Sequence, residues 1–526
     1  MGRTVEQRRT ALGIELGSTR VKAVLLDEDL EVLATGGAEW RSELVDGHWS
    51  YALDDVWRRI RAAVAELRRG FEHRVGAPLT EVGSLGVSAM MHGHLAFDAE
   101  GELLTPFRTW QDTTTARAAR ELSDLFGVNI PMRWSIAHLR QAMLDDEPHV
   151  ARIGFVTTLA GYVHWQLTGR KVLGVGDASG MFPIDVETGG WDAERLARFD
   201  ELAAGQVPWR LAEVLPEVLP AGADAGRLTE AGALLLEPTG ALRAGAVVAP
   251  PEGDAGTGMV ATNSVRPRTA NVSAGTSIFA MVVLDHPLRG RHEELDLVTT
   301  PHGEPVVMVH CNNGAADLQD WVLLLGEAAR ALGAECSTDE LFSTLLRTAL
   351  DGDPGAGGVV ACNHLAGEPI TGLDAGRPLV VREPGQPLTL ANLVRAHLQS
   401  MFATLALGFE ILAEEDVHVD ELFAHGGVFR TKGVAQRLLA GALDVPVSVG
   451  ATGGEGGAWG MALLAAYRLL GEGDLADWLA TRVFAESELE TLRPSPTEVA
   501  GFAEYLARYR AVLAVERAAV DALGRG

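Results

Sequence analysis

The chain has 526 residues, of which 47% are hydrophobic and 22% are charged. This length and composition predict about two to four globular domains with large cores and exclude a wholly disordered chain. The formal net charge of −27 argues against nucleic acid or an anionic membrane as the main partner.

Apolar periodicity predicts that strands and helices alternate along the chain. Residues 11–36 read as a strand hairpin, residues 53–69 as an amphipathic helix and residues 82–88 as a buried strand. Further helices are predicted over residues 116–125, 136–144, 154–166, 315–332, 390–412, 434–443, 453–470 and 497–523. This alternation predicts an α/β layered fold.

Cysteine content and the first residues bear on the cellular compartment. Cys311, Cys336 and Cys362 lack metal-site spacing, so they predict neither a disulfide framework nor a zinc site. The first ten residues are polar and lack the apolar segment of a signal peptide. No run of about 18 apolar residues predicts a membrane span. We therefore expect a cytoplasmic protein with no membrane partner.

One short pattern occurs twice, about half a chain length apart. Residues 11–27 and residues 270–285 each consist of an apolar strand, a turn of glycine and hydroxyl residues, and a second apolar strand. Gly17 and Gly275 stand at the two turns. Two similar halves with such hairpins predict two domains that close on one polyphosphate. Pro267 punctuates the chain between them, and we expect domains at 1–262 and 263–526.

The first hairpin turn offers groups that suit a phosphate. Gly17 lets the backbone approach a ligand closely, while Ser18 and Thr19 offer hydroxyl and amide donors and Lys22 a cation. The Glu15 carboxylate at the strand end could hold Mg²⁺ through water. An ordinary tight hairpin with solvated polar tips is the alternative, but the repeated turn favours phosphate binding.

Asp254 lies among the glycines of residues 252–258. In a phosphoryl transfer, such a carboxylate accepts the proton of the attacking hydroxyl. The alternative, which this motif alone favours, is a loop aspartate that holds its own turn.

Two short motifs have a composition that suits sugar hydroxyls. Met91 and His92 follow the buried strand and could line a sugar pocket, although a lone histidine is more often structural. Trp110 and Asp112 flank an amide, which would suit a sugar or equally a surface turn.

Two further Gly-rich turns lie in the second half, each ahead of a helix. The first contains Gly426 and Gly427, and the second spans residues 453–457. Bare backbone there can accept a base or a ribose, but such turns also end helices.

In order and spacing, these motifs resemble the FGGY carbohydrate kinases nearly end to end, and within that family the xylulokinases. The resemblance rests on residues 15–22, 47–57, 88–93, 177–191, 252–258, 275–277 and 426–427. It implies an α/β fold of two actin-like (ribonuclease H-like) domains, with a nucleotide and sugar cleft between them. It also implies ATP and Mg²⁺ as cofactors, a sugar as the other partner, and a possible homodimer.

Carried over by position, the resemblance implies a role for each motif. Asp254 would be the general base and, with Glu15, a metal ligand. The sugar would contact Met91, His92, Trp110 and Asp112, with Asp254. The ATP-binding residues would be Gly17, Ser18, Thr19, Lys22, Gly275, Thr276, Gly426 and Gly427.

Three positions depart from the family's usual pattern. Glu15 stands in place of Asp, Met90 in place of Gln and Ala255 in place of Asn. Two of these changes fall where the sugar is expected and remove hydrogen-bonding groups, which changes the hydroxyl pattern that a pocket accepts.

The expected activity is ATP-dependent phosphorylation of a pentulose, with D-xylulose first. Ribulose, L-xylulose, a pentitol or gluconate are alternative substrates. A non-catalytic ATP- or sugar-sensing relative is a further alternative. An actin- or chaperone-like ATPase would share the hairpins but gives no reason for Met91 and His92.

Overall fold

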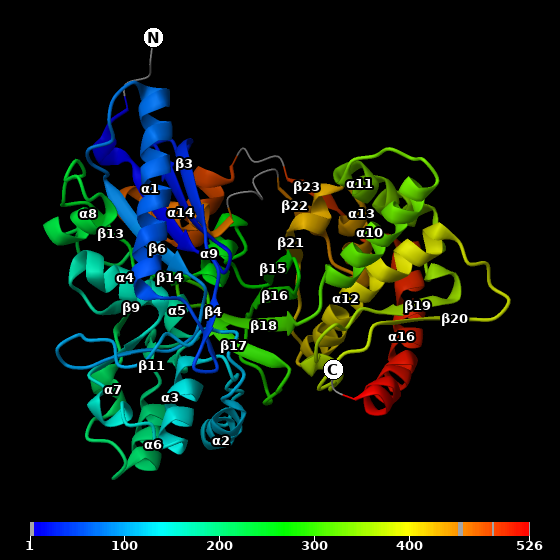
Figure 1. The fold of residues 1–526 in the computed structure, drawn as a ribbon, viewed down its shortest axis with the longest axis horizontal. Coiled ribbons are helices and arrows are strands. Elements are labelled where there is room, and N and C mark those ends of the chain that lie inside the picture. Colours follow the sequence, from blue (N-terminus) through cyan, green and yellow to red (C-terminus); the bar gives the residue numbers. More distant parts are fainter. Residues whose placement is uncertain (1–4, 451–455, 486–488, 525–526) are drawn as a thin grey trace. The chain divides into compact units, whose positions relative to one another are not determined.

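The computed structural model describes residues 5–450, 456–485 and 489–524. Its contacts divide the chain into two compact units. Unit 1 comprises Met1–Arg266, Leu297–Val306 and Gly454–Glu486, and unit 2 comprises Pro267–Asp296, Val307–Gly453 and Ser487–Gly526 (Figure 1). The expected boundary between residues 262 and 263 stays a prediction. The first three residues of the Gly-rich turn at 453–457 lie outside the described residues.

The main sheet of unit 1 has the strand order β13-β6-β1-β2-β3, with β14 also paired to β6. Its strands are β1 (Ala11–Leu16), β2 (Arg20–Leu26), β3 (Val32–Glu39), β6 (Ser84–Ala89), β13 (Val247–Val248) and β14 (Glu252–Gly253). β1 and β2 form the antiparallel hairpin, whereas β6 pairs parallel to β1. The predicted first hairpin is therefore the centre of this sheet.

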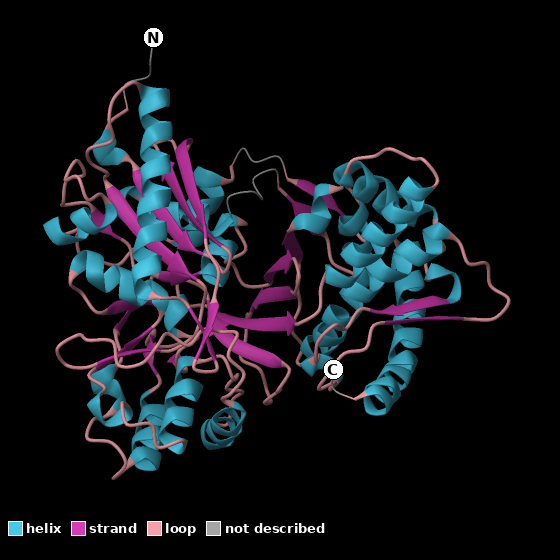
Figure 2. Cartoon of the chain, in the orientation of Figure 1, coloured by secondary structure: helices cyan, strands magenta, loops and turns pink. Residues whose placement is uncertain are grey.

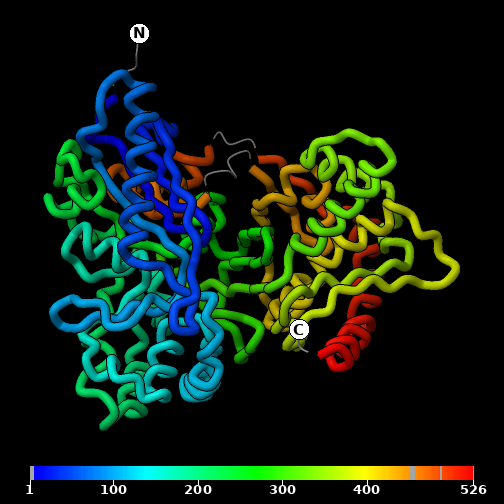
Figure 3. The backbone as a smooth tube through the Cα atoms, in the orientation of Figure 1, coloured from blue at the N-terminus to red at the C-terminus, as the bar shows by residue number. Residues whose placement is uncertain are grey.

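Two helices far apart in sequence cover this sheet, α1 (Leu53–Val75) and α14 (Gly456–Leu470). Leu12 and Ile14 of β1 belong to one hydrophobic core with Ile60 of α1. Gly13 points to the opposite face, because successive strand side chains alternate. A Cβ built there would lie 2.3 Å from Ala458 O, so the α14 backbone rests directly on β1. Figure 3 shows this late segment beside the N-terminal strands.

The remaining elements of unit 1 surround this sheet. They are β4 (Glu43–Val45), β5 (His48–Ser50), β7 (Leu95–Phe97), α2 (Ala116–Phe126), α3 (Ser135–Leu144), β8 (Phe155–Thr157), α4 (Leu159–Thr168), β9 (Val172–Gly174), α5 (Val175–Ala178), β10 (Ile184–Asp185), β11 (Gly190–Trp191), α6 (Ala193–Ala203), α7 (Leu211–Val214), β12 (Glu217–Leu219), α8 (Glu230–Leu236), α9 (Asp254–Ala261) and α15 (Leu475–Trp478). The helix predicted over residues 154–166 is wrong at its start, where β8 precedes α4. The Thr158 side chain accepts from Gly161 N–H and so begins α4.

The second sheet has the strand order β17-β18-β16-β15-β21-β22-β23. Its strands are β15 (Thr269–Ala274), β16 (Ile278–Val283), β17 (Leu295–Thr299), β18 (Pro305–Cys311), β21 (Glu421–His425), β22 (Val447–Val449) and β23 (Glu490–Leu492). β15 and β16 form an antiparallel hairpin, β21 pairs parallel to β15, and β22 pairs parallel to β21. The strands β1, β2, β6 and β13 follow the same plan. The predicted doubled α/β fold is confirmed.

The helices of unit 2 pack on this second sheet or on one another (Figure 2). They are α10 (Ala316–Ala331), α11 (Thr338–Thr348), α12 (Leu390–Glu414), α13 (Val434–Leu443) and α16 (Pro496–Leu523), beside the small hairpin of β19 (Val359–Cys362) and β20 (Leu379–Arg382). Within the described part of the chain, α12 alone has the length and mean hydropathy, 1.2, of a membrane span. Because 72% of that apolar stretch is buried inside the protein, α12 serves as a core helix.

Candidate active site

The first predicted phosphate turn, residues 17–19, connects β1 to β2 in unit 1. Gly17 N–H donates to Arg20 O at 3.1 Å, which closes the turn. Lys22 Nζ lies 3.9 Å from Glu15 Oε2 on the neighbouring strand. Lys22 is therefore tethered beside the turn rather than pointing away from it.

Glu15, a predicted metal ligand, has a second partner in the structure. Its Oε2 accepts from Ala458 N–H at 3.2 Å, in the first turn of α14. The first N–H groups of a helix have no partner within the helix and carry partial positive charge, so a carboxylate is favoured there. Glu15 thus stabilises the start of α14.

Asp254 opens α9 directly after β14, and Gly253 is the residue before the helix. Residues 254–261 form this helix, so Asp254 is not the loop aspartate of the alternative interpretation. Met91 N–H donates to Asp254 Oδ1 at 3.3 Å. Burial raises the pKa of Asp254 to about 6, although the hydrogen bond from Met91 opposes the shift.

Two buried carboxyl groups that sequence reasoning did not assign lie beside Asp254. Thr158 Oγ1 donates to Asp177 Oδ2 at 2.6 Å, and Asp177 N–H donates to Glu252 Oε2 at 3.0 Å. Burial and the charge of Asp254 together raise the pKa of Asp177 to about 7, although the hydrogen bond from Thr158 opposes the shift. Burial also raises the pKa of Glu252 well above its usual range.

The predicted sugar residues Met91 and His92 lie next to this acidic group. A Cβ built on Gly253 would meet Met91 Cγ at 2.1 Å, so Met91 packs against the residue that precedes Asp254. His92 Nδ1 is 3.1 Å from Gly180 O, and His92 is 5% exposed. Its φ of 70° is a left-handed conformation that is uncommon for residues other than glycine, although histidine adopts it more often than most. The structure thus brings Met91 and Asp254 together and holds His92 in a turn.

Asp112 and Trp110 take other positions within unit 1. Asp112 Oδ2 contacts His48 Nδ1, and Asp112 Oδ1 accepts from Thr114 N–H at 2.8 Å. Burial raises the pKa of Asp112, but the hydrogen bonds from Thr114 and His48 outweigh it and lower the pKa overall. Trp110 packs against the core of the main sheet. Both carboxylate oxygens of Asp112 are therefore used inside the protein.

Met90 and Ala255, the two departures expected at the sugar, are both buried. Met90 is 1% exposed and belongs to the hydrophobic core of unit 1. Ala255, in the first turn of α9, is 8% exposed. At position 90, where Met stands in place of the family's usual Gln, the Met90 side chain packs in the hydrophobic core.

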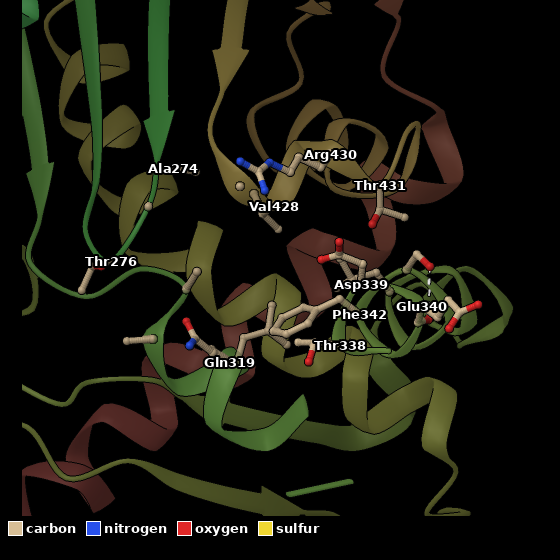
Figure 4. A pocket seen from close by; sticks show the side chains of 17 residues that line it. Ala274, Thr276, Gln319, Thr338, Asp339, Glu340, Phe342, Val428, Arg430 and Thr431 are labelled. Atoms are coloured by element: carbon tan, nitrogen blue, oxygen red, sulfur yellow. Dashed lines mark hydrogen bonds between the residues drawn. The ribbon is translucent and has the colours of Figure 1, made fainter. Parts of the chain in front are cut away.

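A pocket of about 710 Å³ lies within unit 2 (Figure 4). The turn between β15 and β16, the first turns of α10 and α11 and the segment after Gly427 form its walls. The lining residues are Ala274, Gly275, Thr276, Ala315, Ala316, Leu318, Gln319, Thr338, Asp339, Glu340, Phe342, Ser343, Leu346, Gly427, Val428, Arg430 and Thr431. Pockets for small ligands are typically about 300–1,000 Å³. Gly275, Thr276 and Gly427, which the sequence singled out, meet in this pocket.

The second phosphate turn is fixed from behind by the start of α10. Gly314 N–H donates to Thr276 O at 2.7 Å, and Ala315 N–H donates to Gly275 O at 2.8 Å. Ala315 and Ala316 line the pocket, so the N-terminus of α10 faces it. A helix N-terminus favours an anionic ligand.

Gly426 supports this pocket without lining it. Its φ is 123°, and a Cβ there would lie 2.0 Å from Ala274 O. Only glycine fits this close approach between β15 and the turn after β21.

Sequence reasoning missed the α11 wall and Arg430. Figure 4 shows Arg430, Asp339 and Phe342 around the pocket. Arg430 is exposed and has no ion-pair partner among the residues that the structure describes. No motif marks the α11 residues in the sequence, because α11 is brought to the pocket only by folding. Arg430 closely follows the turn of Gly426 and Gly427, but no role was assigned to it from the sequence.

Two family models match the chain. One describes the N-terminal domain of the FGGY family of carbohydrate kinases and matches residues 10–241, and the other describes its C-terminal domain and matches residues 270–469. The chain belongs to the FGGY family of carbohydrate kinases. The predicted resemblance is therefore confirmed, and the chain is a carbohydrate kinase.

Relatives of this FGGY kinase include enzymes for several substrates. It is 20% identical to a xylulose kinase of Staphylococcus xylosus over 464 residues, which cover 86% of this chain and 90% of that one. It is 28% identical to a xylulose kinase of Escherichia coli over 224 residues, 41% of this chain and 45% of that one. It is 25% identical to a glycerol kinase of Methylobacterium nodulans over 238 residues, 41% of this chain and 44% of that one.

Solved structures show the same fold as this FGGY kinase. A xylulose kinase structure from Brucella ovis matches with a TM-score of 0.78 at 22% identity, covering 98% of this chain and 100% of that chain. A gluconate kinase structure from Lactobacillus acidophilus matches with a TM-score of 0.79 at 17% identity, covering 98% of this chain and 99% of that chain. The predicted two-domain kinase fold is confirmed.

Proposed function

We propose that this FGGY kinase transfers the γ-phosphoryl group of ATP to a hydroxyl group of a pentulose, with D-xylulose as the first candidate. The observation that carries the proposal is Asp254, a buried carboxylate at the start of α9 that Met91 N–H holds in place. The sugar is suggested by the xylulose kinase of Staphylococcus xylosus, to which most of this chain aligns.

In this proposal Asp254 is the general base. Its carboxylate takes the proton of the attacking sugar hydroxyl, while Met91 and His92 contact the sugar. Phosphoryl transfer has a loose transition state, so positioning and charge stabilisation supply most of the catalysis. Asp254 is well suited because Met91 N–H fixes one oxygen and the helix start fixes its backbone.

The pocket of unit 2 is proposed to bind ATP. Gly275, Thr276 and the N-terminus of α10 would face the phosphates, and Gly427 would approach the adenosine. Arg430 supplies a positive charge at the pocket wall. The volume of about 710 Å³ is in the range for a nucleotide.

Mg²⁺ would be held by Glu15 and Asp254 together with water and the ATP phosphates. Within the described residues, no group of three or more histidine, cysteine or acidic side chains could hold a metal ion. Glu15 and Asp254 fit a cation that keeps several waters and is bound by one or two carboxylates plus phosphate. Bound Mg²⁺ neutralises charge on the phosphate oxygens. The cytoplasmic location and the homodimer stay predictions.

The test is a coupled assay of ADP release with D-xylulose, L-xylulose, D-ribulose, L-ribulose, pentitols, glycerol and gluconate. Asp254→Asn should lower kcat about 10²- to 10⁴-fold, the usual contribution of a positioned base. The Kd for ATP should change less than about twofold, because the base contacts the sugar. Near-normal turnover of Asp254→Asn would contradict the assignment.

Asp27→Asn is the matched control. Asp27 is a buried loop aspartate whose Oδ1 accepts from Asp29 N–H and Glu31 N–H, both at 3.0 Å. It has the structural role that was the alternative for Asp254, so its substitution should leave kcat unchanged. If no sugar on the panel releases ADP while ATP still binds, the chain is instead a non-catalytic relative.

A further inference from the structure

Hydrogen bonds to its carbonyl groups hold the first phosphate turn, residues 17–19, in place. Trp40 Nε1–H donates to Gly17 O at 2.6 Å. Tyr51 O–H donates to Ser18 O at 2.6 Å. Trp40 N–H donates to Thr19 O at 3.1 Å. Each of the three carbonyl oxygens of the turn therefore has a partner.

The two aromatic residues form one unit. Their ring centroids are 4.3 Å apart with an interplanar angle of 32°, and Trp40 and Tyr51 are only 3% and 4% exposed. Burial raises the pKa of Tyr51, although a hydrogen bond with Ser42 opposes the shift, so the hydroxyl keeps the proton that it donates. A buried indole and a buried phenol are stable here because their polar atoms bind the turn.

Holding the carbonyl groups also fixes the amide groups. In a trans peptide, C=O and N–H point in opposite directions from one rigid plane. Gly17 O shares its peptide plane with Ser18 N–H, and Ser18 O shares its plane with Thr19 N–H. With both carbonyls bound to the aromatic pair, both N–H groups point to the other side of the turn.

That other side is open to a ligand. Ser18 is half-buried and Thr19 is exposed. The described part of the chain provides no hydrogen-bond acceptor for Ser18 N–H or Thr19 N–H. Successive backbone N–H groups that point into one space form an anion site.

We propose that Trp40 and Tyr51 are positioning residues, which aim the amides of Ser18 and Thr19 at the phosphoryl group during its transfer. This inference rests on the proposed function. Neither side chain touches the reacting atoms. They act by keeping two peptide planes from rotating while the charge of the transferring group is spread over its three equatorial oxygens, where fixed donors stabilise it.

The test uses Tyr51→Phe and Trp40→Phe, which keep an aromatic ring but remove the donor to the turn. Small errors in positioning cost up to about 100-fold in rate, so we expect kcat to fall roughly 10- to 100-fold. The KM values for ATP and sugar should change less than about threefold, because other residues are proposed to bind both substrates before transfer. Binding of ADP with aluminium fluoride and sugar, a mimic of the transferring phosphoryl group, should weaken by the same factor as kcat.

Tyr162→Phe is the matched control. Tyr162 is 8% exposed in the same core, and its hydroxyl accepts from Trp57 Nε1–H at 3.0 Å, away from the turn. Its loss removes a comparable buried hydrogen bond and should leave kcat within about twofold. Equal falls in kcat and Tm for Tyr162→Phe and Tyr51→Phe would overturn the inference, as would unchanged kcat in both turn variants. Absence of transfer by the unmodified protein would instead count against the proposed function.

Discussion

At the scale of single residues, Glu15 shows how one carboxylate can serve two purposes. It stands where the family usually has aspartate, and its Oε2 accepts from Ala458 N–H and lies near Lys22 Nζ. The hydrogen bond needs only an oxygen acceptor, whereas a metal ion needs the negative charge. Substitutions can therefore separate the two roles.

Glu15→Gln keeps an oxygen for Ala458 N–H but removes the charge. The unfolding free energy should fall by about 0.3–1 kcal/mol, the usual contribution of a charge at a helix N-terminus. The Mg²⁺ concentration for half-maximal rate should rise several-fold, because one carboxylate of the proposed site is lost. Chemical unfolding and a Mg²⁺ titration of the kinase rate measure the two effects, and Glu15→Asp should restore the Mg²⁺ dependence. An unchanged Mg²⁺ dependence in Glu15→Gln would show that Glu15 does not bind Mg²⁺ and only stabilises the start of α14.

Sequence motifs predicted some residues of the candidate site and missed others for a physical reason. Gly275, Thr276 and Gly427 belong to glycine-rich turns, whose composition is visible in the chain. Asp177 lies in the segment 177–191, which contributed to the resemblance, and Arg430 follows a glycine-rich turn. Neither received a role, because their places in the site arise from the packing of α5 and of the segment after β21. A local sequence pattern identifies residues that sit in unusual backbone turns. It misses residues whose role depends on neighbours that only folding brings close.

At the scale of secondary-structure elements, the packing of α14 on β1 depends on a missing side chain. At Gly13 a Cβ would lie 2.3 Å from both Ala458 O and Ala462 N. These are backbone atoms of α14, so neither can move aside as a flexible side chain would. The helix rests closer to the sheet than any larger residue allows.

Gly13→Ala should therefore destabilise unit 1 by about 1–3 kcal/mol or more, the usual cost of overpacking a core. Gly70→Ala in α1 is the control, because a Cβ there meets only Ala34 Cβ at 3.6 Å and Thr35 O at 3.9 Å. It should stabilise the protein by about 0.5–1 kcal/mol through helix propensity. Urea unfolding measures both changes. Equal stability of the two variants would contradict the close packing of α14.

His164 in α4 makes the stability of unit 1 depend on pH. Burial lowers the pKa of His164 to about 4, although the hydrogen bond between Nε2 and Ala225 O raises it in part. The unfolded histidine has a pKa of about 6.5, so the unfolded state binds the extra proton first as pH falls. Stability is fully present above about pH 6.5 and is lost as pH falls toward 4.

Between pH 7 and pH 5 this group should cost about 2 kcal/mol of unfolding free energy. His164→Gln keeps a donor for Ala225 O and cannot titrate, so its pH-dependent loss should be smaller by that amount. His73→Gln, at an exposed position of α1, should match the unmodified protein. Urea unfolding at the two pH values decides, and identical losses in all three proteins would contradict the assignment.

Periodicity predicted the long helices better than the short elements. The predicted helix at 390–412 corresponds to α12, and that at 434–443 to α13, because several turns of apolar spacing are hard to mistake. The strand β8 was read as helix because its three residues are all buried, so they show no alternation. The sequence did not predict helix α9, because the glycines of residues 252–258 lower helix propensity, which packing against α14 overrides.

At the scale of the whole molecule, the chain leaves unit 1 after residue 266, rejoins it briefly at Leu297–Val306, and returns to it last with Gly454–Glu486. The returning segment contains α14, which covers the face of the main sheet that carries Gly13. Unit 1 is therefore complete only when a late part of the sequence has joined it.

A fragment of residues 1–262 should consequently be unstable by itself. Its sheet would expose the apolar face that α14 covers, and such surfaces cause aggregation. We expect the fragment to be insoluble or to bind the dye ANS strongly. Co-expression with residues 263–526, which include α14, should restore a soluble complex. A soluble, cooperatively unfolding fragment that binds no dye would contradict this prediction.

Because α14 comes late in the sequence, the main sheet of unit 1 must wait for it during synthesis. A ribosome adds about 5–20 residues per second, so roughly 10–40 s pass between the last residue of the first segment and the first residue of α14. During that interval the N-terminal sheet has emerged with one face uncovered. The nascent chain should therefore need a chaperone on that face, and synonymous codons that slow translation between residues 267 and 453 should lower the yield of folded protein.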